Sequence, residues 1–178
     1  MNYIILDLEA TCWENVRSNR NETIEIGAVK LNDKLEFVDE FQTFIKPIRN
    51  PWLSDFCKNL TSIKQEDVNK APYFIEAINK FKDWIGEEEY FLCSWGFYDK
   101  NQLMTDCDLH KISNNWLLNH ISIKHQHGKM IGKGRGVGME RALQMLKLQL
   151  EGIHHRGIDD ARNIAKIFIK IYDKLEFK

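Results

Sequence analysis

The chain has 178 residues, a formal net charge of −1, 43% hydrophobic and 29% charged residues, which fits one soluble globular domain over residues 1–178. The near-neutral charge argues against a protein that coats duplex nucleic acid by neutralising many phosphates, so we expect any nucleic-acid partner to be held over a few nucleotides. Without a leader-like start, an apolar run near 18 residues or a CxxC pair, we expect a cytoplasmic protein with free thiols, neither secreted nor inserted into a membrane.

The first predicted element is a strand over residues 3–8, because this run is apolar enough to be buried on both faces. Side chains alternate along a strand, so Asp7 and Glu9 project to the same side. Two adjacent carboxylates repel each other, and burial raises their pKa values, unless a divalent cation lies between them. A strand end that simply reaches solvent explains the same two acids equally well.

A polar loop over residues 12–21 is followed by a predicted hairpin, with strands at 23–31 and 35–45 and a turn at 32–34. Two prolines then bracket an irregular crossing segment, because proline supplies no ladder donor. Two short helices are expected next. One covers residues 52–59, and the other begins at Thr61, whose hydroxyl would cap residues 64–68.

The middle of the chain predicts a helix-bearing crossover to a second central strand. Phe74, Ile78, Phe81 and Ile85 repeat at helical spacing, and Gly86 ends this amphipathic helix. Residues 90–95 then suit a buried parallel strand, and 99–109 form a helix with Asp99 in its first turn. A strand, a helix-bearing crossover and a strand imply an α/β fold with a sheet flanked by helices.

Residues 116–123 predict a short strand with a helix behind it. A glycine-rich basic loop over 128–138 follows, and it fits neither GxxxxGK[ST] nor GxGxxG. We interpret it as a mobile loop that can touch a nucleic-acid backbone through Lys129, Lys133 and Arg135. The histidines nearby lack cysteine partners, which disfavours zinc; they are His110, His120, His125 and His127.

Two helices are predicted after this loop. The first begins at Met139 and carries leucines at helical spacing as far as Leu150. The second carries an apolar stripe from Ala161 to Leu175.

Acidic residues stand where an α/β sheet places its functional groups, at strand ends and helix starts. Asp7 and Glu9 end the first strand, Asp99 follows the second central strand, and Asp159 and Asp160 open the last helix. Four converging carboxylates suit two Mg²⁺ or Mn²⁺ ions, which prefer oxygen ligands. Two such ions can hold the attacking and leaving oxygens of a phosphoryl displacement, which fits phosphodiester hydrolysis.

His155 precedes Asp160 by five residues, in the loop that enters the last helix. An imidazole there can take a proton from water near neutral pH, so we predict that His155 is the general base. The neighbouring His154 is the alternative.

Three segments of the chain resemble the exonuclease motifs of the DEDDh 3′–5′ exonucleases, in the family's order. They are residues 7–13 (DLEATCW), 94–99 (SWGFYD) and 154–163 (HHRGIDDARN). The Cys12-Trp13 pair after Ala10-Thr11 is most similar to the Eri/KapD group, which includes the histone-mRNA exonuclease. The resemblance spans about residues 3–170 and implies a ribonuclease H-like (DnaQ-like) fold.

The resemblance also implies roles for individual residues. Two divalent cations, Mg or Mn, would be held by Asp7, Glu9, Asp99 and Asp160, and His155 would activate water. The terminal nucleotide would contact a second group of residues, whose alternative role is ordinary packing. These are Ala10, Thr11, Trp13, Leu60, Thr61 and Tyr98.

We therefore expect a metal-dependent 3′–5′ exonuclease that shortens single-stranded RNA or DNA from the 3′ end, with RNA slightly preferred, and releases nucleoside 5′-monophosphates. Relatives that recognise RNA stem-loops often carry a further RNA-binding domain, whereas this chain resembles a bare catalytic domain. Three alternatives remain open at this point. They are an oligoribonuclease-like scavenger of very short RNAs, a polymerase proofreading subunit, and a nucleic-acid-binding module that has lost catalysis.

Overall fold

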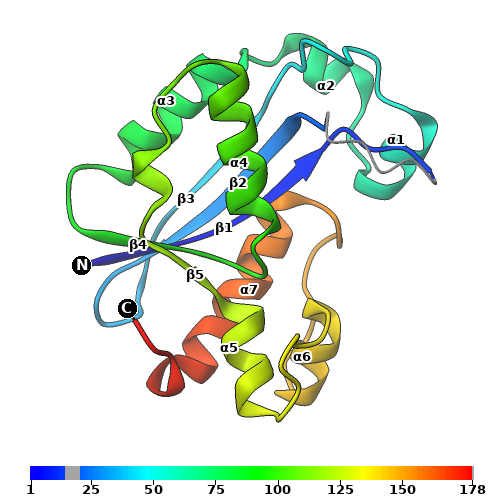
Figure 1. Cartoon of the computed structure of the whole chain (residues 1–178). Coiled ribbons are helices and arrows are strands. Elements are labelled where there is room, and N and C mark those ends of the chain that lie inside the picture. Colours follow the sequence, from blue (N-terminus) through cyan, green and yellow to red (C-terminus); the bar gives the residue numbers. More distant parts are fainter. Residues whose placement is uncertain (15–20, 178) are drawn as a thin grey trace.

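The computed structural model describes residues 1–14 and 21–177, so most of the predicted loop at 12–21 lies outside the described residues. Within the described part, five strands form one mixed sheet in the order β3-β2-β1-β4-β5, with helices on both faces (Figure 1). This confirms the predicted α/β class. The strands are β1 (Asn2–Ala10), β2 (Thr23–Leu31), β3 (Phe37–Phe44), β4 (Tyr90–Ser94) and β5 (His120–Ser122).

The predicted hairpin and the predicted parallel strand are both present. β2 pairs antiparallel with β1 and with β3, whereas β4 pairs parallel with β1 and β5. The side chain of Asn32 closes the hairpin turn by accepting the N–H groups of Lys34 and Glu36. Leu35 has a positive φ of 63°, and β3 therefore begins at Phe37, two residues later than expected.

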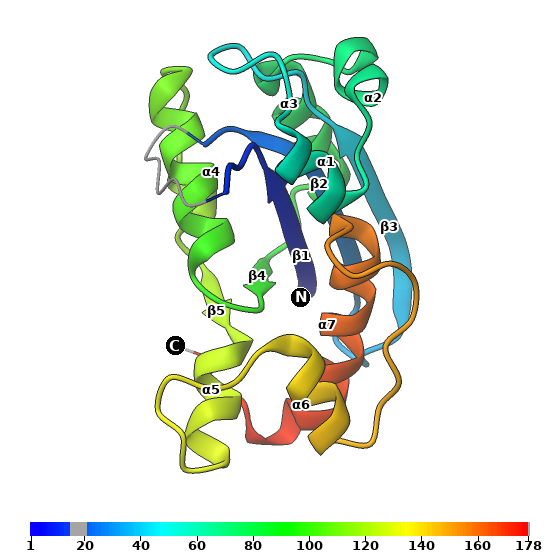
Figure 2. The same cartoon turned by 90° about the vertical axis from the view of Figure 1, so that its right-hand side faces the viewer.

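The helices pack in two layers, one on each face of the sheet (Figures 1 and 2). Along β1, Ile4, Leu6 and Leu8 pack against α3 and α4, while Tyr3 and Ile5 pack against α6 and α7. None of the helices in the described part of the chain is long and apolar enough to cross a bilayer. The helices are α1 (Asp55–Thr61), α2 (Gln65–Lys70), α3 (Phe74–Ile85), α4 (Tyr98–Leu109), α5 (Ile123–Met130), α6 (Met139–Met145) and α7 (Gly157–Ile171).

The predicted cap at Thr61 is wrong. Thr61 is the last residue of α1, and its buried hydroxyl donates to the backbone carbonyl of Cys57. The N-terminus of α1 is capped by Ser54, whose side chain accepts a hydrogen bond from the N–H of Cys57. At α2 the Asp67 carboxylate reaches back to the N–H of Lys64, the residue at the N-cap position. Thr61 therefore cannot cap α2, because it belongs to α1 and its hydroxyl is already hydrogen-bonded there.

The last third follows the prediction with different boundaries. α5 extends through Gly128 to Met130, so the glycine-rich loop is shorter than expected. The loop folds back on α5: a Cβ on Gly128 would lie 2.6 Å from the backbone nitrogen of Gly136. α6 ends at Met145 rather than near Leu150, and Lys147 just beyond it has a positive φ of 57°.

Candidate active site

A cavity of about 350 Å³ opens where the carboxyl ends of β1 and β4 meet the N-terminal ends of α4 and α7. It collects side chains from all three motif segments as well as from α5 and α6. The lining residues are Asp7, Leu8, Glu9, Trp95, Gly96, Tyr98, Asp99, Lys124, Met139, His154, His155 and Asp160.

Three carboxylates meet inside this cavity. Asp7 and Glu9 project from the same face of β1, and Asp160 comes from the first turn of α7. Each offers an oxygen, and these oxygens lie within 4.8 Å of one another. The last motif of the chain therefore reaches the first strand, although about 150 residues separate them.

Two glycines allow this close approach. Gly27 of β2 pairs with Asp7, and Gly157 begins α7 directly against it. A Cβ on Gly27 would lie 2.1 Å from the carbonyl carbon of Gly157. Any other residue at position 27 would therefore clash with the backbone of α7 and push it away. The absence of a side chain at Gly27 thus brings the N-terminus of α7, and with it Asp160, onto the sheet.

Asp99 lines the same cavity from the first turn of α4 and is 4% exposed. Its Oδ1 accepts the backbone N–H of Leu8 at 3.2 Å, which ties α4 to the end of β1. Asp99 does not belong to the group of three whose oxygens converge within 4.8 Å. The structure therefore gathers the four predicted acids in one cavity as a close trio with Asp99 beside it.

The cavity disfavours its own negative charge. Burial, followed by the neighbouring carboxylates of Asp99 and Glu9, raises the pKa of Asp7 well above its ordinary value. Burial and the Glu25 carboxylate raise the pKa of Glu9 to about 8, and burial raises that of Asp99 to about 6. Clustered carboxylate oxygens with an excess of negative charge are the ligand set that Mg²⁺ or Mn²⁺ prefers, so these residues fit a divalent cation site.

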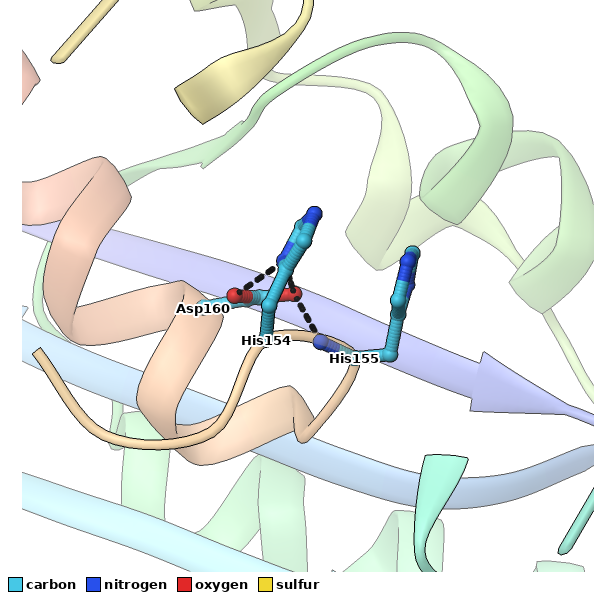
Figure 3. Close-up of side chains that lie close together, drawn as sticks. All are labelled: His154, His155 and Asp160. Atoms are coloured by element: carbon cyan, nitrogen blue, oxygen red, sulfur yellow. Dashed lines mark hydrogen bonds and ion pairs between the residues drawn. The ribbon is translucent and has the colours of Figure 1, made fainter. Parts of the chain in front are cut away.

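His154 and His155 line the cavity, and Figure 3 shows their rings side by side next to Asp160. The Nδ1 atom of His154 lies 2.9 Å from Oδ2 of Asp160, and the backbone N–H of His155 donates to the same oxygen at 2.9 Å. The two rings stack with their centroids 4.0 Å apart. Asp160 is thus bonded to both residues, but the ring of His155 is not part of either hydrogen bond.

The turn that carries these histidines is hydrogen-bonded to Glu25, a residue that was not predicted from the sequence. Glu25 lies on β2 and is completely buried. Its carboxylate accepts hydrogen bonds from the Arg156 guanidinium, from the N–H of Gly157 at 3.1 Å and from the Gln42 amide at 2.6 Å. The positive φ of His155, 65°, belongs to the same turn.

The residues expected to contact a nucleotide are spread more widely. Tyr98 lines the cavity and is 52% exposed. The hydroxyls of Thr11 and Thr61 are buried and already bonded, to the N–H of Glu22 and to the carbonyl of Cys57 respectively. None of the remaining three lines the cavity in the part of the chain that the structure describes: Ala10, Trp13 and Leu60.

Lys124, Trp95 and Met139 line the cavity without having been predicted. The backbone N–H of Lys124 donates to the carbonyl of Trp95 at 2.7 Å, which joins the start of α5 to the end of β4. The cue in the sequence was weak, because the segment around Lys124 has no clear helical or strand periodicity. The basic residues Lys129, Lys133 and Arg135 of the glycine-rich segment do not line the cavity within the described chain.

The four other histidines do not gather into a metal-binding cluster among the described residues. His110 instead stacks on Phe74, and His125 packs on Phe97.

Comparison with known proteins gives a consistent assignment. The family model described as Exonuclease (RNase_T) matches residues 4–168. The human protein named 3′-5′ exoribonuclease 1 is 32% identical over 182 residues, which cover 94% of this chain and 51% of that protein. The Xenopus laevis protein named ERI1 exoribonuclease 2 is 30% identical, over 92% of this chain and 27% of that protein. This chain therefore spans from about a quarter to about half the length of these two relatives.

Solved structures agree in fold over nearly the whole chain. The nuclease domain of 3′hExo, a DEDDh family member bound to rAMP, superposes with a TM-score of 0.92 at 31% identity, covering 99% of this chain and 96% of that one. Exonuclease I superposes with a TM-score of 0.79 at 8% identity over 97% of this chain and 41% of that one, which shows the shared fold alone. The chain belongs to the exonuclease family, as a DEDDh exonuclease of the Eri type with the ribonuclease H-like fold.

Proposed function

We propose that this chain is a divalent-metal-dependent 3′–5′ exonuclease and that residues 1–178 act as one exonuclease domain. Its substrate is single-stranded or short nucleic acid, with RNA slightly preferred over DNA. Its products are nucleoside 5′-monophosphates. The observation that carries the proposal is the convergence of Asp7, Glu9 and Asp160 within 4.8 Å, beside two imidazoles, in an open cavity. The names of the relatives, 3′-5′ exoribonuclease and ERI1 exoribonuclease, support the direction of attack and the preference for RNA.

Asp7, Glu9, Asp99 and Asp160 would hold two divalent cations, Mg²⁺ or Mn²⁺. Bound there, the cations would stabilise the charge that develops on the phosphate and lower the pKa of water. The raised pKa values of Asp7, Glu9 and Asp99 support this assignment, because a cluster that resists ionisation alone becomes fully ionised beside positive charge.

His155 is the proposed general base. Its ring lines the cavity and has no hydrogen bond to Asp160, whereas the ring of His154 is bonded to that carboxylate. Burial and the adjacent His154 lower the pKa of His155, so its imidazole is neutral near pH 7 and can accept a proton from water. The backbone hydrogen bond from His155 to Asp160 holds the base at a fixed place beside the acids.

The terminal nucleotide would lie in the cavity against Tyr98, which is half exposed there. Thr11 and Thr61 would contribute through their backbone, because their hydroxyls are already bonded inside the protein. Ala10, Trp13 and Leu60 do not line the cavity, so they would contact only the part of the nucleotide that extends beyond it. The near-neutral charge of the chain supports a grip on a few nucleotides only.

The direct test is hydrolysis of a single-stranded RNA and a matched DNA, each labelled at the 5′ or at the 3′ end, with Mn²⁺, Mg²⁺ or EDTA. The wild type should shorten 5′-labelled strands one nucleotide at a time and release a labelled mononucleotide from 3′-labelled strands, with no reaction in EDTA. Asp7→Asn and Asp160→Asn should abolish the reaction. Asp55→Asn is the matched control, because the Asp55 side chain is 92% exposed on α1. Undiminished hydrolysis in either active-site variant would overturn the proposal.

A further inference from the structure

An aromatic pair stands on the rim of the cavity without a role in the proposed chemistry. Phe97 is 46% exposed although it precedes α4 directly, and its ring packs on His125 with centroids 4.7 Å apart and an interplanar angle of 36°. The ring of His120 lies behind it at 5.8 Å. The ring is thus held by its neighbours while nearly half of the residue's surface remains open to a ligand.

This pair adjoins the cavity on two sides. Phe97 stands between Gly96 and Tyr98, and His125 follows Lys124, and these three neighbours all line the cavity. The N-terminal ends of α4 and α5 lie side by side in both views of the molecule (Figures 1 and 2). The rings are also held in place, because Nδ1 of His125 is hydrogen-bonded to the Ser122 hydroxyl at 2.7 Å.

The charge around the pair suits a phosphate backbone. α5 has no acidic residue and carries Lys124 in its first turn, whereas Lys129 near its other end is paired with Glu176. Lys124 lines the cavity and directly precedes His125, so a cation is available next to the aromatic pair. Aromatic rings next to a cationic groove are how proteins hold single-stranded nucleic acid, because every base offers a face for stacking.

We infer that Phe97, supported by His125, is the stacking platform for the base of the penultimate nucleotide, immediately 5′ of the scissile phosphate, with Lys124 as the cation for the adjoining backbone. The inference rests on the proposed function, since it assigns a second subsite to the same active site. The cavity holds the terminal nucleotide, and the next base lies outside it on the rim. The occupant is a single strand, because bases in a duplex stack on one another and are not free to turn a face onto Phe97.

The experiment compares two oligoribonucleotides that differ only at the penultimate position, one with adenine there and one with an abasic residue. The wild type should hydrolyse the adenine substrate with a kcat/KM at least about fivefold higher, which is the lower end of what base stacking contributes. In Phe97→Ala this ratio should fall to near one. Phe97→Tyr keeps a ring and should retain the ratio, which separates stacking from a general disturbance of the fold.

Phe37→Ala is the matched control, because Phe37 is also an exposed phenylalanine, 62% exposed at the start of β3, and lies outside the cavity lining. It should keep the wild-type ratio. A wild type that does not discriminate between the two substrates, or a Phe97→Ala variant that discriminates as well as the wild type, would overturn the inference and leave the proposed function standing. A wild type that hydrolyses neither substrate would overturn the proposed function itself.

Discussion

The Nε atom of Arg156 lies 3.2 Å from Oε2 of Glu25, which connects β2 to a turn 131 residues later in the chain. The Glu25 carboxylate is completely buried, and the Arg156 guanidinium also lies over the ring of Phe44. Because Arg156 directly follows His155, this ion pair fixes where the proposed base stands relative to the acids. The position of the base thus depends on Glu25, a residue outside the three motif segments.

Arg156→Ala should lower the free energy of unfolding by about 3 kcal/mol, because it leaves the buried Glu25 carboxylate without its cation. Arg162→Ala is the matched control. The side chain of Arg162 is 44% exposed and pairs with Glu40 and Asp159, so its loss should cost no more than about 1 kcal/mol. Urea unfolding of both variants checks this, and equal losses would show that the buried pair contributes no more than the exposed one.

His155→Asn should lower kcat by roughly 10²- to 10⁴-fold, the usual contribution of a general base, and change Mn²⁺ affinity far less. His154→Asn should change Mn²⁺ affinity more than kcat, because the His154 ring is hydrogen-bonded to Asp160 rather than free in the cavity. Steady-state kinetics and Mn²⁺ titration of the two variants make the comparison. If His154→Asn loses more turnover than His155→Asn, the two roles are exchanged.

Burial lowers the pKa of His120 to about 4, and this has a consequence for stability. The unfolded chain binds this proton at a higher pH than the folded chain, because its pKa lies near the ordinary value of 6.5. The contribution of His120 to stability is therefore complete above about pH 6.5 and is lost as the pH falls towards 4.

His120→Gln should remove this dependence while leaving a polar group near the Ser94 hydroxyl. When the pH is lowered from 7.5 to 4.5, the free energy of unfolding should fall by up to about 3 kcal/mol more in the wild type than in the variant. Urea unfolding at the two pH values measures this difference, in which the titration of the cavity acids cancels because both proteins share them. Parallel pH profiles would contradict the expectation.

Much of the fold follows from short-range patterns in the sequence. The strand at residues 23–31, the helical spacing from Phe74 and the stop at Gly86 rest on local patterns, and the structure confirms each of them. The place of Asp7, Glu9, Asp99 and Asp160 in one cavity also follows from a general rule, because strand ends and helix starts meet at one edge of an α/β sheet.

The remaining features depend on contacts between distant segments. Nothing local marks Glu25 as the partner of Arg156, or Gly27 as the residue that admits Gly157. The predicted cap at Thr61 was wrong for a different, local reason, because its hydroxyl is bonded to the carbonyl of Cys57 within α1. Lys124 lines the cavity because β5 pairs with β4 and so places the start of α5 beside it. The weak pattern around residues 116–123 did not predict this pairing.

The central claim is that the acids of the cavity hold divalent cations together, and Mn²⁺ binding followed by electron paramagnetic resonance tests it most directly. In the presence of a nucleoside 5′-monophosphate, the wild type should bind about two Mn²⁺ per chain, and Asp55→Asn should bind the same number. Asp160→Asn should bind fewer than about one. A wild type that binds no Mn²⁺, or an Asp160→Asn variant that binds as much as the wild type, would contradict the account.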